Sequence, residues 1–182
     1  MSRKGRPIQP GVPLTRDTEA MIRVDHAGEY GAVRIYEGQL AVLGKSSKLA
    51  ATIRKMAQQE QGHLKAFDAL VNERKVRPTA LEPVWRVAGF ALGAATALLG
   101  EKAAMACTAS VEEVIDEHYA DQVRRLDHDP QLQKAIEGFR ADEIAHREEA
   151  LQNGAEEAPG YKLLSETIKA GCRLAITLSE KI

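Results

Sequence analysis

The chain contains two copies of one pattern of glutamates and a histidine, with identical spacing. In each copy, a glutamate is followed 31 residues later by a second glutamate that begins a Glu-x-x-His, since 60 − 29 and 143 − 112 are both 31. Residues three apart on an α-helix lie on one face about one turn apart, so each Glu-x-x-His directs a carboxylate and an imidazole toward one point. The six residues are Glu29, Glu60 and His63 in the first copy and Glu112, Glu143 and His146 in the second.

This pattern predicts a metal site with two ions. Two helices that carry a Glu-x-x-His, with two more that each give one glutamate, form the di-iron or di-manganese site of ferritin-like four-helix bundles. Four carboxylates carry a charge of −4, which two divalent cations would balance. Carboxylate and imidazole ligands suit iron or manganese better than calcium or magnesium, and zinc also accepts these ligand types. The alternative is that the glutamates are solvated, but all six residues lie within apolar stripes, where an uncompensated carboxylate is costly.

Apolar residues at helical spacing place each candidate ligand on the inner face of a helix. The first helix is expected from about Asp17 to Gly44, and the second from an N-cap at Ser46 or Ser47 to a break near Pro78. A third ends before Asp129-Pro130, a fourth spans Leu132 to Ala150, and a last amphipathic helix spans Tyr161 to Glu180. Strand-like alternation is hard to find. We therefore predict an all-α fold, a ferritin-like four-helix bundle with additional amphipathic helices at a membrane interface.

Length and composition limit the other possibilities. The 182 residues suggest one domain, with residues 1–16 as a flexible basic leader and 17–182 as a single catalytic domain. With 25 Lys and Arg against 26 Asp and Glu, the formal charge is −1, so no nucleic-acid partner is expected. Cys107 and Cys172 form no Cys-x-x-Cys, which excludes a thiolate metal site and favours free thiols in a reducing compartment. Prolines follow the basic N-terminus before any apolar run, so no secretory signal is expected.

One stretch, Val87 to Gly100, has 14 residues without charge and is rich in Ala, Gly and Leu. It is too short to span about 30 Å of hydrocarbon, so it is either part of the core or a helix embedded in the membrane interface. Gly89 and Gly93 are expected to loosen the helix. Trp85, at its start, is a residue type that favours the lipid headgroup region.

Several polar residues lie near the candidate ligands by spacing. His26 and His118 are expected to hydrogen bond around the site rather than to bind metal directly. Asp25, Glu113 and Asp142 are candidates either for orienting the ligand imidazoles or for facing solvent.

The sequence resembles the di-iron demethoxyubiquinone hydroxylases of ubiquinone biosynthesis from about residue 18 to the C-terminus. The resemblance is carried by Arg23-Val24-Asp25-His26-Ala27-Gly28-Glu29-Tyr30-Gly31-Ala32, Glu60 with His63-Leu64-Lys65, Ala106-Cys107-Thr108, Val111-Glu112-Glu113, His118-Tyr119, Phe139-Arg140 with Glu143 and His146, and Ala170-Gly171-Cys172-Arg173. The first and last of these blocks separate this family from ferritins and rubrerythrins, which share the ligand spacing.

The resemblance implies that the six residues of the repeat bind two iron ions, with Glu112 preferred to Glu113 because it keeps both spacing and stripe. It implies that His118 and Tyr119 lie near the metal, as candidate catalytic residues. The implied reaction is an O₂-dependent monooxygenation of a demethoxylated polyprenyl benzoquinone, with NADH as the ultimate electron donor. A ferroxidase, another di-iron or di-manganese oxidoreductase and a metal-free helical scaffold remain as alternatives.

The resemblance also implies partners and a location. The substrate carries a long isoprenoid tail, so the expected partners are the polyprenyl quinone, a membrane surface and a lipid-carrying protein of ubiquinone biosynthesis. Mitochondrial members carry a long transit peptide, and this chain begins almost directly at the catalytic domain. We therefore expect a peripheral protein on the cytoplasmic face of a bacterial inner membrane.

Overall fold

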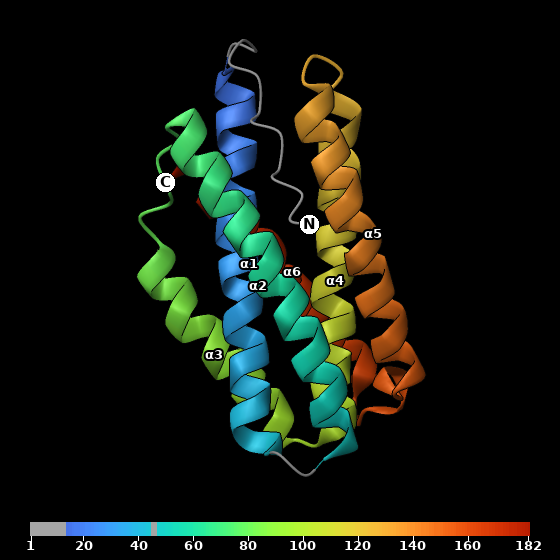
Figure 1. Cartoon of the computed structure of the whole chain (residues 1–182). Helices are drawn as coiled ribbons and strands as arrows, with labels where there is room; N and C mark the ends of the chain where they lie inside the picture. The colour runs from blue at the N-terminus through green and yellow to red at the C-terminus, as the bar shows by residue number, and fades with distance from the viewer. Residues whose placement is uncertain (1–13, 45–46) are drawn as a thin grey trace, which may run out of the picture.

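A computed structural model of the chain describes residues 14–44 and 47–182. Every regular element within these ranges is helical, which confirms the all-α prediction. The elements in chain order are α1 (Arg16–Leu43), α2 (Lys48–Arg74), α3 (Glu82–Leu98), α4 (Glu101–Arg125), α5 (Pro130–Gln152), the short 3-10 helix η1 (Ala155–Glu157) and α6 (Tyr161–Lys181) (Figure 1). Most of the predicted leader, residues 1–13, and the predicted cap Ser46 lie outside the described residues.

The ends of the first two helices follow from local capping. The hydroxyl of Thr15 accepts a hydrogen bond from the N–H of Thr18, and α1 begins at the next residue after Thr15. Gly44 ends α1 with φ of +70°, a conformation that glycine adopts without steric cost. Ser47 caps α2 by accepting hydrogen bonds from two N–H groups of its first turn. Both predicted boundaries, at Gly44 and at Ser47, are thus confirmed.

Four helices, α1, α2, α4 and α5, form the bundle. Helix α1 packs beside α2, and α4 beside α5, so the bundle consists of two helical hairpins that face each other (Figure 1). Two apolar clusters fill its interior, one around Ile53 and Met105 and the other around Phe67 and Leu126. On every bundle helix the candidate ligands lie between the two clusters, so the polar site is enclosed by apolar residues along the bundle axis.

Helix α3 packs closely against α1. A Cβ atom added at Gly93 would lie 1.9 Å from the backbone oxygen of Ile35, and one added at Gly38 would lie 2.2 Å from that of Phe90. These glycines therefore permit a backbone contact that no other residue allows. Helix α3 is continuous through Gly89 and Gly93, which differs from the expectation that these residues loosen it, because packing on α1 compensates for their low helix propensity.

Helix α6 lies against α4 and α1, behind the bundle in Figure 1. Backbone carbonyls at its C-terminal end accept hydrogen bonds from other segments. The carbonyl of Ile182 accepts from the Ala80 N–H, and the carbonyl of Glu180 accepts from the Arg23 guanidinium. The indole N–H of Trp85 donates to Ser179 at 2.9 Å and links α3 to α6. None of the helices described here combines the length and apolar character needed to cross a bilayer.

Candidate metal centre

The structure brings the six residues of the repeated pattern together in the middle of the bundle. Each of the four helices supplies its ligands from the stripe that faces the opposite hairpin, as the helical spacing predicts. All six side chains are buried, with at most 5% of any residue exposed. Helix α1 supplies Glu29, α2 supplies Glu60 and His63, α4 supplies Glu112, and α5 supplies Glu143 and His146.

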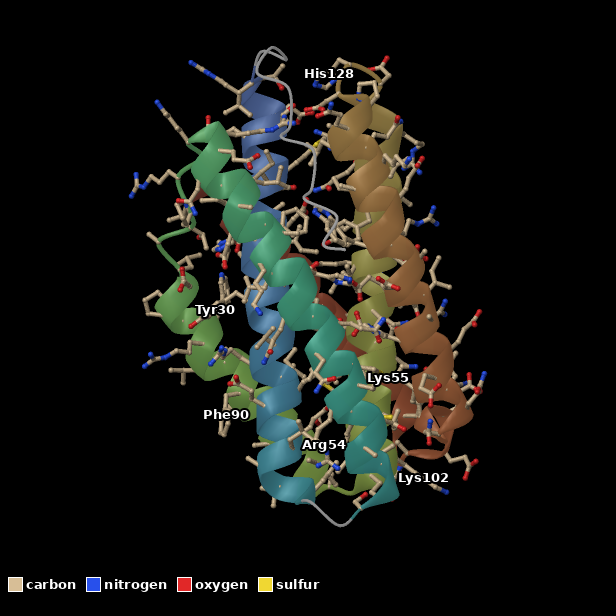
Figure 2. The ribbon with its side chains drawn as sticks, viewed as in Figure 1. Tyr30, Arg54, Lys55, Phe90, Lys102 and His128 are labelled. Carbon is tan, nitrogen blue, oxygen red and sulfur yellow. The ribbon has the colours of Figure 1, made fainter. Side chains whose placement is uncertain are left out.

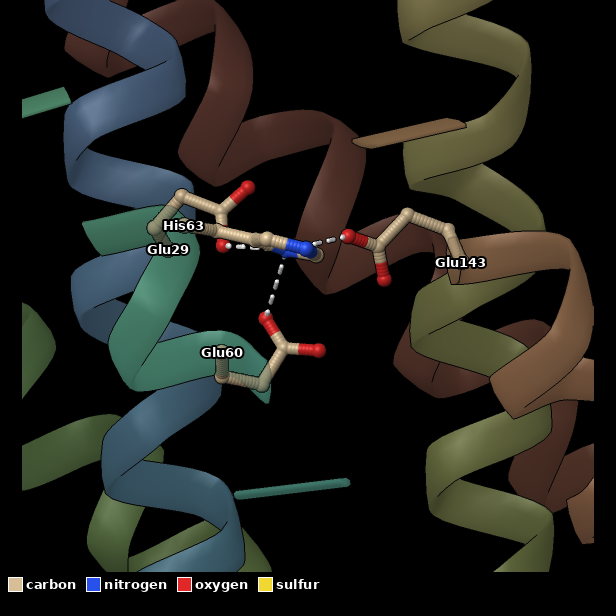
Figure 3. A group of neighbouring side chains, drawn as sticks. All are labelled: Glu29, Glu60, His63 and Glu143. Carbon is tan, nitrogen blue, oxygen red and sulfur yellow. Dashed lines mark ion pairs between the residues drawn. The ribbon is translucent and has the colours of Figure 1, made fainter. Parts of the chain in front are cut away.

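The first group of ligand atoms surrounds Nδ1 of His63. This nitrogen lies 3.1 Å from Oε1 of Glu143, 3.5 Å from Oε2 of Glu29 and 3.8 Å from Oε2 of Glu60 (Figure 3). One ligand atom from each of the four residues lies within 4.8 Å of the others, which is close enough for them to share one metal ion.

The second group contains Glu60, Glu112, Glu143 and His146, again with ligand atoms within 4.8 Å of one another. Nδ1 of His146 lies 2.9 Å from Oε1 of Glu60 and 3.4 Å from Oε2 of Glu143. Glu60 and Glu143 belong to both groups, each with one oxygen directed toward each histidine. The arrangement therefore offers two adjacent metal positions joined by two shared carboxylates.

The polar atoms of this cage fit a pair of cations. Several of them are buried and make no hydrogen bond within the described chain, and leaving such an atom unsatisfied costs about 1–3 kcal/mol or more for a charged group. Cations would satisfy these atoms and balance the four carboxylate charges. The atoms are Oε2 of Glu29, Oε1 of Glu60, Oε2 of Glu112, both carboxylate oxygens of Glu143, and Nδ1 of His63 and of His146.

Proton affinities reflect the same excess of negative charge. As long as no cation compensates the cage, burial and the charge of Glu143 raise the pKa of both Glu60 and Glu112 well above the usual range. Burial works to lower the pKa of His63, but the carboxylates of Glu143 and Glu29 beside its Nδ1 outweigh this and raise the pKa to about 11. Without metal, protons would thus take the place of cations in the cage.

Two tyrosines donate hydrogen bonds to the glutamates of the opposite hairpin. Tyr36 on α1 donates to Oε1 of Glu112 at 2.7 Å. Tyr119 on α4 donates to Oε1 of Glu29. Each phenol leaves the other oxygen of its glutamate without a hydrogen bond and fixes the direction in which that oxygen points. The predicted proximity of Tyr119 to the cage is therefore seen, and Tyr36 takes an equivalent position that the sequence reasoning missed.

The ligand histidines are also held from outside the cage. Nε2 of His63 lies 3.1 Å from Oδ2 of Asp142, and Nε2 of His146 lies 3.3 Å from Oε1 of Gln59. A partner on this nitrogen leaves Nδ1 facing the cage as the atom available to bind a metal ion. Of the three candidate orienting residues, Asp142 thus contacts a ligand imidazole directly.

The other two candidates have different partners. Glu113 accepts hydrogen bonds from Lys169 and Arg147, away from the cage. Asp25 lies 3.1 Å from Nε2 of His118 and also accepts from Gln122 at 2.7 Å. Burial works to lower the pKa of His118, but the hydrogen bond and charge of Asp25 raise it above the usual value.

Neither of the additional histidines joins the two ligand groups. His118 belongs to the pair with Asp25, and His26 contacts Asp68 at 3.0 Å. Sequence reasoning missed Gln59, Asp68 and Gln122 as partners in this network. Gln59 had a usable signal, since it precedes Glu60 as Asp142 precedes Glu143.

The sequence is also similar to those of known proteins. The model of a family described as ubiquinone biosynthesis protein COQ7 matches residues 16–179. The chain belongs to the COQ7 family. The matched range includes all six candidate ligands of this COQ7 family member, together with His118 and Tyr119.

Individual relatives extend across bacteria and eukaryotes. The 3-demethoxyubiquinol 3-hydroxylase of Rhodospirillum rubrum is 56% identical over 165 residues, which covers 90% of this chain and 78% of the relative. The NADPH-dependent 3-demethoxyubiquinone 3-hydroxylase of Mus musculus mitochondria is 54% identical over 168 residues, covering 90% and 77%. The mitochondrial 5-demethoxyubiquinone hydroxylase of Saccharomyces cerevisiae is 38% identical over 181 residues, covering 90% and 78%. All three COQ7 family relatives are thus named as hydroxylases.

Proposed function

We propose that this protein hydroxylates a demethoxylated polyprenyl benzoquinone, of the 3-demethoxyubiquinol type, in ubiquinone biosynthesis. The observation that carries this proposal is the buried cage with two adjacent metal positions, found in a chain 56% identical to a named 3-demethoxyubiquinol 3-hydroxylase. The protein is therefore an enzyme of the monooxygenase type, with O₂ as the source of the inserted oxygen atom.

The cage is proposed to hold two iron ions. Glu29 and His63 would bind one, Glu112 and His146 would bind the other, and Glu60 and Glu143 would bridge them. When bound there, reduced iron would supply electrons for the activation of O₂. The mixed oxygen and nitrogen ligand set fits iron, and Glu60 and Glu143 would have to be ionised to hold both ions.

The protein's own groups prepare the site for this chemistry. Tyr36 and Tyr119 hold one oxygen of Glu112 and of Glu29, so the remaining oxygens stay directed into the cage. The apolar clusters on either side exclude water, which strengthens electrostatic interactions inside the bundle. For His118 and Tyr119 we propose a role in proton delivery or ring positioning, since Tyr119 contacts Glu29 and His118 lies beside it in the chain.

An apolar cavity of about 360 Å³ is the proposed binding site of the quinone. It lies between α1, α4, α3 and α6, and its volume falls within the range of small-molecule sites. Gly28 and Val111 line it and directly precede Glu29 and Glu112, so the cavity borders the two helices that carry these ligands. Further lining residues are Ile35, Leu92, Ile115, Ile168, Gly171 and Ala175.

The outer faces of α3 and α6 support a peripheral association with membranes. Large apolar side chains are exposed on both helices, and Phe90 is directed away from the bundle (Figure 2). In the stretch Val87 to Gly100, the glycine-rich side packs on α1, while the other side is exposed and is the side we propose to contact the membrane. The exposed side chains are Val84, Val87, Phe90, Leu98 and Leu99 around α3 and Leu163 and Leu174 on α6.

Three finer expectations remain predictions. The resemblance implied NADH as the ultimate electron donor, whereas the name of the mouse relative specifies NADPH. We propose a reduced nicotinamide as donor, and parallel assays with each nucleotide decide between them. A lipid-carrying partner and the cytoplasmic face of a bacterial inner membrane also remain predictions.

The test of this function follows the inserted oxygen atom. Protein loaded with iron is supplied with a reductant, a demethoxylated quinone in lipid and ¹⁸O₂, and the product is analysed by mass spectrometry. The hydroxylated quinone should gain one labelled oxygen, and labelled water should contribute none. Iron oxidation with mineral accumulation and no modified quinone would instead establish a ferroxidase.

The metal content is tested separately. The purified protein should contain two irons per chain, and Glu112→Ala should lose metal because it removes a ligand of the second position. Glu113→Ala is the matched control, since its carboxylate pairs with Lys169 outside the cage. Equal iron content in both variants would refute the ligand assignment.

A further inference from the structure

The duplication extends beyond the six ligands. The two copies are offset by 83 residues, since 112 − 29 is 83, and the same offset relates other residues around the cage. It carries the helices α1, α2 and α3 approximately onto α4, α5 and α6. Residue pairs of identical type are Glu29 and Glu112, Tyr36 and Tyr119, Gln39 and Gln122, Glu60 and Glu143, and His63 and His146.

Contacts around the cage follow the same two-fold relationship. Tyr36 donates to Glu112, and its counterpart Tyr119 donates to Glu29. Gln39 donates to Thr108 at 3.2 Å, and Gln122 donates at 2.7 Å to Asp25, the counterpart of Thr108. Each half thus supports the ligands of the other half, and the two metal positions would be equivalent if every such pair were identical.

The partners of the ligand imidazoles break this equivalence. Asp142 contacts Nε2 of His63, and its counterpart Gln59 contacts Nε2 of His146. One position therefore has an ionisable carboxylate behind its histidine, whereas the other has a neutral amide at a slightly longer distance. Asp25 and Thr108 also differ in charge, but Asp25 contacts His118 and Gln122 and neither of the two ligand imidazoles. Among the direct partners of these imidazoles, the difference is the one between Asp142 and Gln59.

We propose that the two metal positions are inequivalent, and that the position of Glu29 and His63 binds a divalent cation first and more tightly. An imidazole whose outer N–H is donated to a carboxylate becomes a stronger electron donor at its other nitrogen, and loss of such a partner lowers metal affinity 10- to 100-fold. Asp142 has 46% of its side chain exposed, so solvent screening favours the lower end, about tenfold. Asp142 acts here as a positioning residue through His63.

This inference rests on the proposed di-metal cage, and a titration with Co²⁺ alone, in the absence of substrate, tests it. Wild-type protein should bind two Co²⁺ per chain with affinities that differ about tenfold or more. His63→Ala should remove the tighter event and His146→Ala the weaker one, which assigns the two positions. Fewer than two Co²⁺ per wild-type chain would overturn the cage itself and with it the metal part of the proposed function.

Two variants then change the charge of the residues that contact the ligand imidazoles from outside the cage. Asp142→Asn should weaken the first binding event about tenfold and leave the second unchanged, while Gln59→Glu should tighten the second. The first variant should weaken Co²⁺ binding and the second should strengthen it, so a folding defect in one variant does not hide the result of the other. Glu137→Gln, an exposed residue of α5, is the control for a general change in charge. Two bound Co²⁺ with equal affinities, or an equal shift of both events by Asp142→Asn, would overturn the inequivalence while leaving the cage intact.

Discussion

Tyr36 donates a hydrogen bond of 2.7 Å to Glu112 across the bundle, from α1 to α4. Burial and the negative charge of Glu112 raise the pKa of Tyr36 well above its usual value, so the phenol remains a donor at all physiological pH values. The relationship shows that the cage is supported by residues from the hairpin opposite to each ligand.

Tyr36→Phe removes this donor without changing the shape of the core. Oε1 of Glu112 is then buried without its phenol partner, which costs about 1–3 kcal/mol. We expect a lower iron content at the second position and a lower turnover, measured by metal analysis and quinone assay. Tyr119→Phe should have the corresponding effect at the position of Glu29. Unchanged iron content and turnover in both variants would contradict the proposed support.

The apolar cavity should accept the quinone. Ala175→Phe places an aromatic ring into the cavity from α6, so it should raise the KM for quinone about tenfold or more, the equivalent of at least about 1.4 kcal/mol. Iron content should be unchanged because Ala175 lies outside the cage. Ala170→Phe, at an exposed position of the same helix, is the matched control. Similar kinetics for the two variants would place the substrate elsewhere.

Close packing of α3 on α1 should depend on the absence of a Cβ atom at Gly93. Gly93→Ala should lower the free energy of unfolding by about 1–3 kcal/mol, because its Cβ would overlap the Ile35 carbonyl. Gly138→Ala, where the added Cβ meets nothing within 4 Å, should instead stabilise the protein by up to about 1 kcal/mol through helix propensity. Urea denaturation of both variants measures the difference, and equal effects would argue against the close contact.

Membrane binding should depend on the exposed side of α3. Val87→Glu combined with Leu98→Glu introduces two charges at side chains that are 65% and 74% exposed, so liposome co-sedimentation should fall while iron content stays constant. The exposed α2 residues Ala51 and Ala69, changed to Glu together, add the same charge elsewhere. Equal binding by the two double variants would show that α3 is not the contact surface.

The ion pair between Arg74 and Asp129 should make stability depend on pH. Burial works to raise the pKa of Asp129, but the hydrogen bond from Arg74 outweighs it and holds the pKa below the usual range. A folded pKa below the unfolded value of about 3.9 contributes stability above that pH, which is lost as pH falls through the folded pKa.

Asp129→Asn keeps a side chain that caps α5 but removes the charge. At pH 7 it should lower the free energy of unfolding by about 1.5–3 kcal/mol, as expected for a hydrogen bond between charged groups. The difference from wild type should shrink as the pH is lowered below about 3.9. Denaturant unfolding across this pH range provides the measurement, and a difference independent of pH would rule out the ion pair as its cause.

The amino-acid sequence by itself determined the helices and the candidate ligands. Helical periodicity and capping are local properties, so the spacing of Glu60 and His63 indicates a shared face without knowledge of the rest of the fold. The equal spacing of the two copies extended that inference from one motif to a six-residue cage.

Only the tertiary structure decided which residues from different helices meet. Tyr36 and Glu112 are 76 residues apart, and Gln59 and His146 are 87 apart, so their contacts depend on how the two hairpins face each other. The same reason applies to the stretch from Val87 to Gly100, whose composition fits both a core helix and an interfacial one. One side of this helix is buried because its glycines pack on α1, and the opposite side is exposed. Which side is buried depends on the position of α1, which the local sequence does not specify.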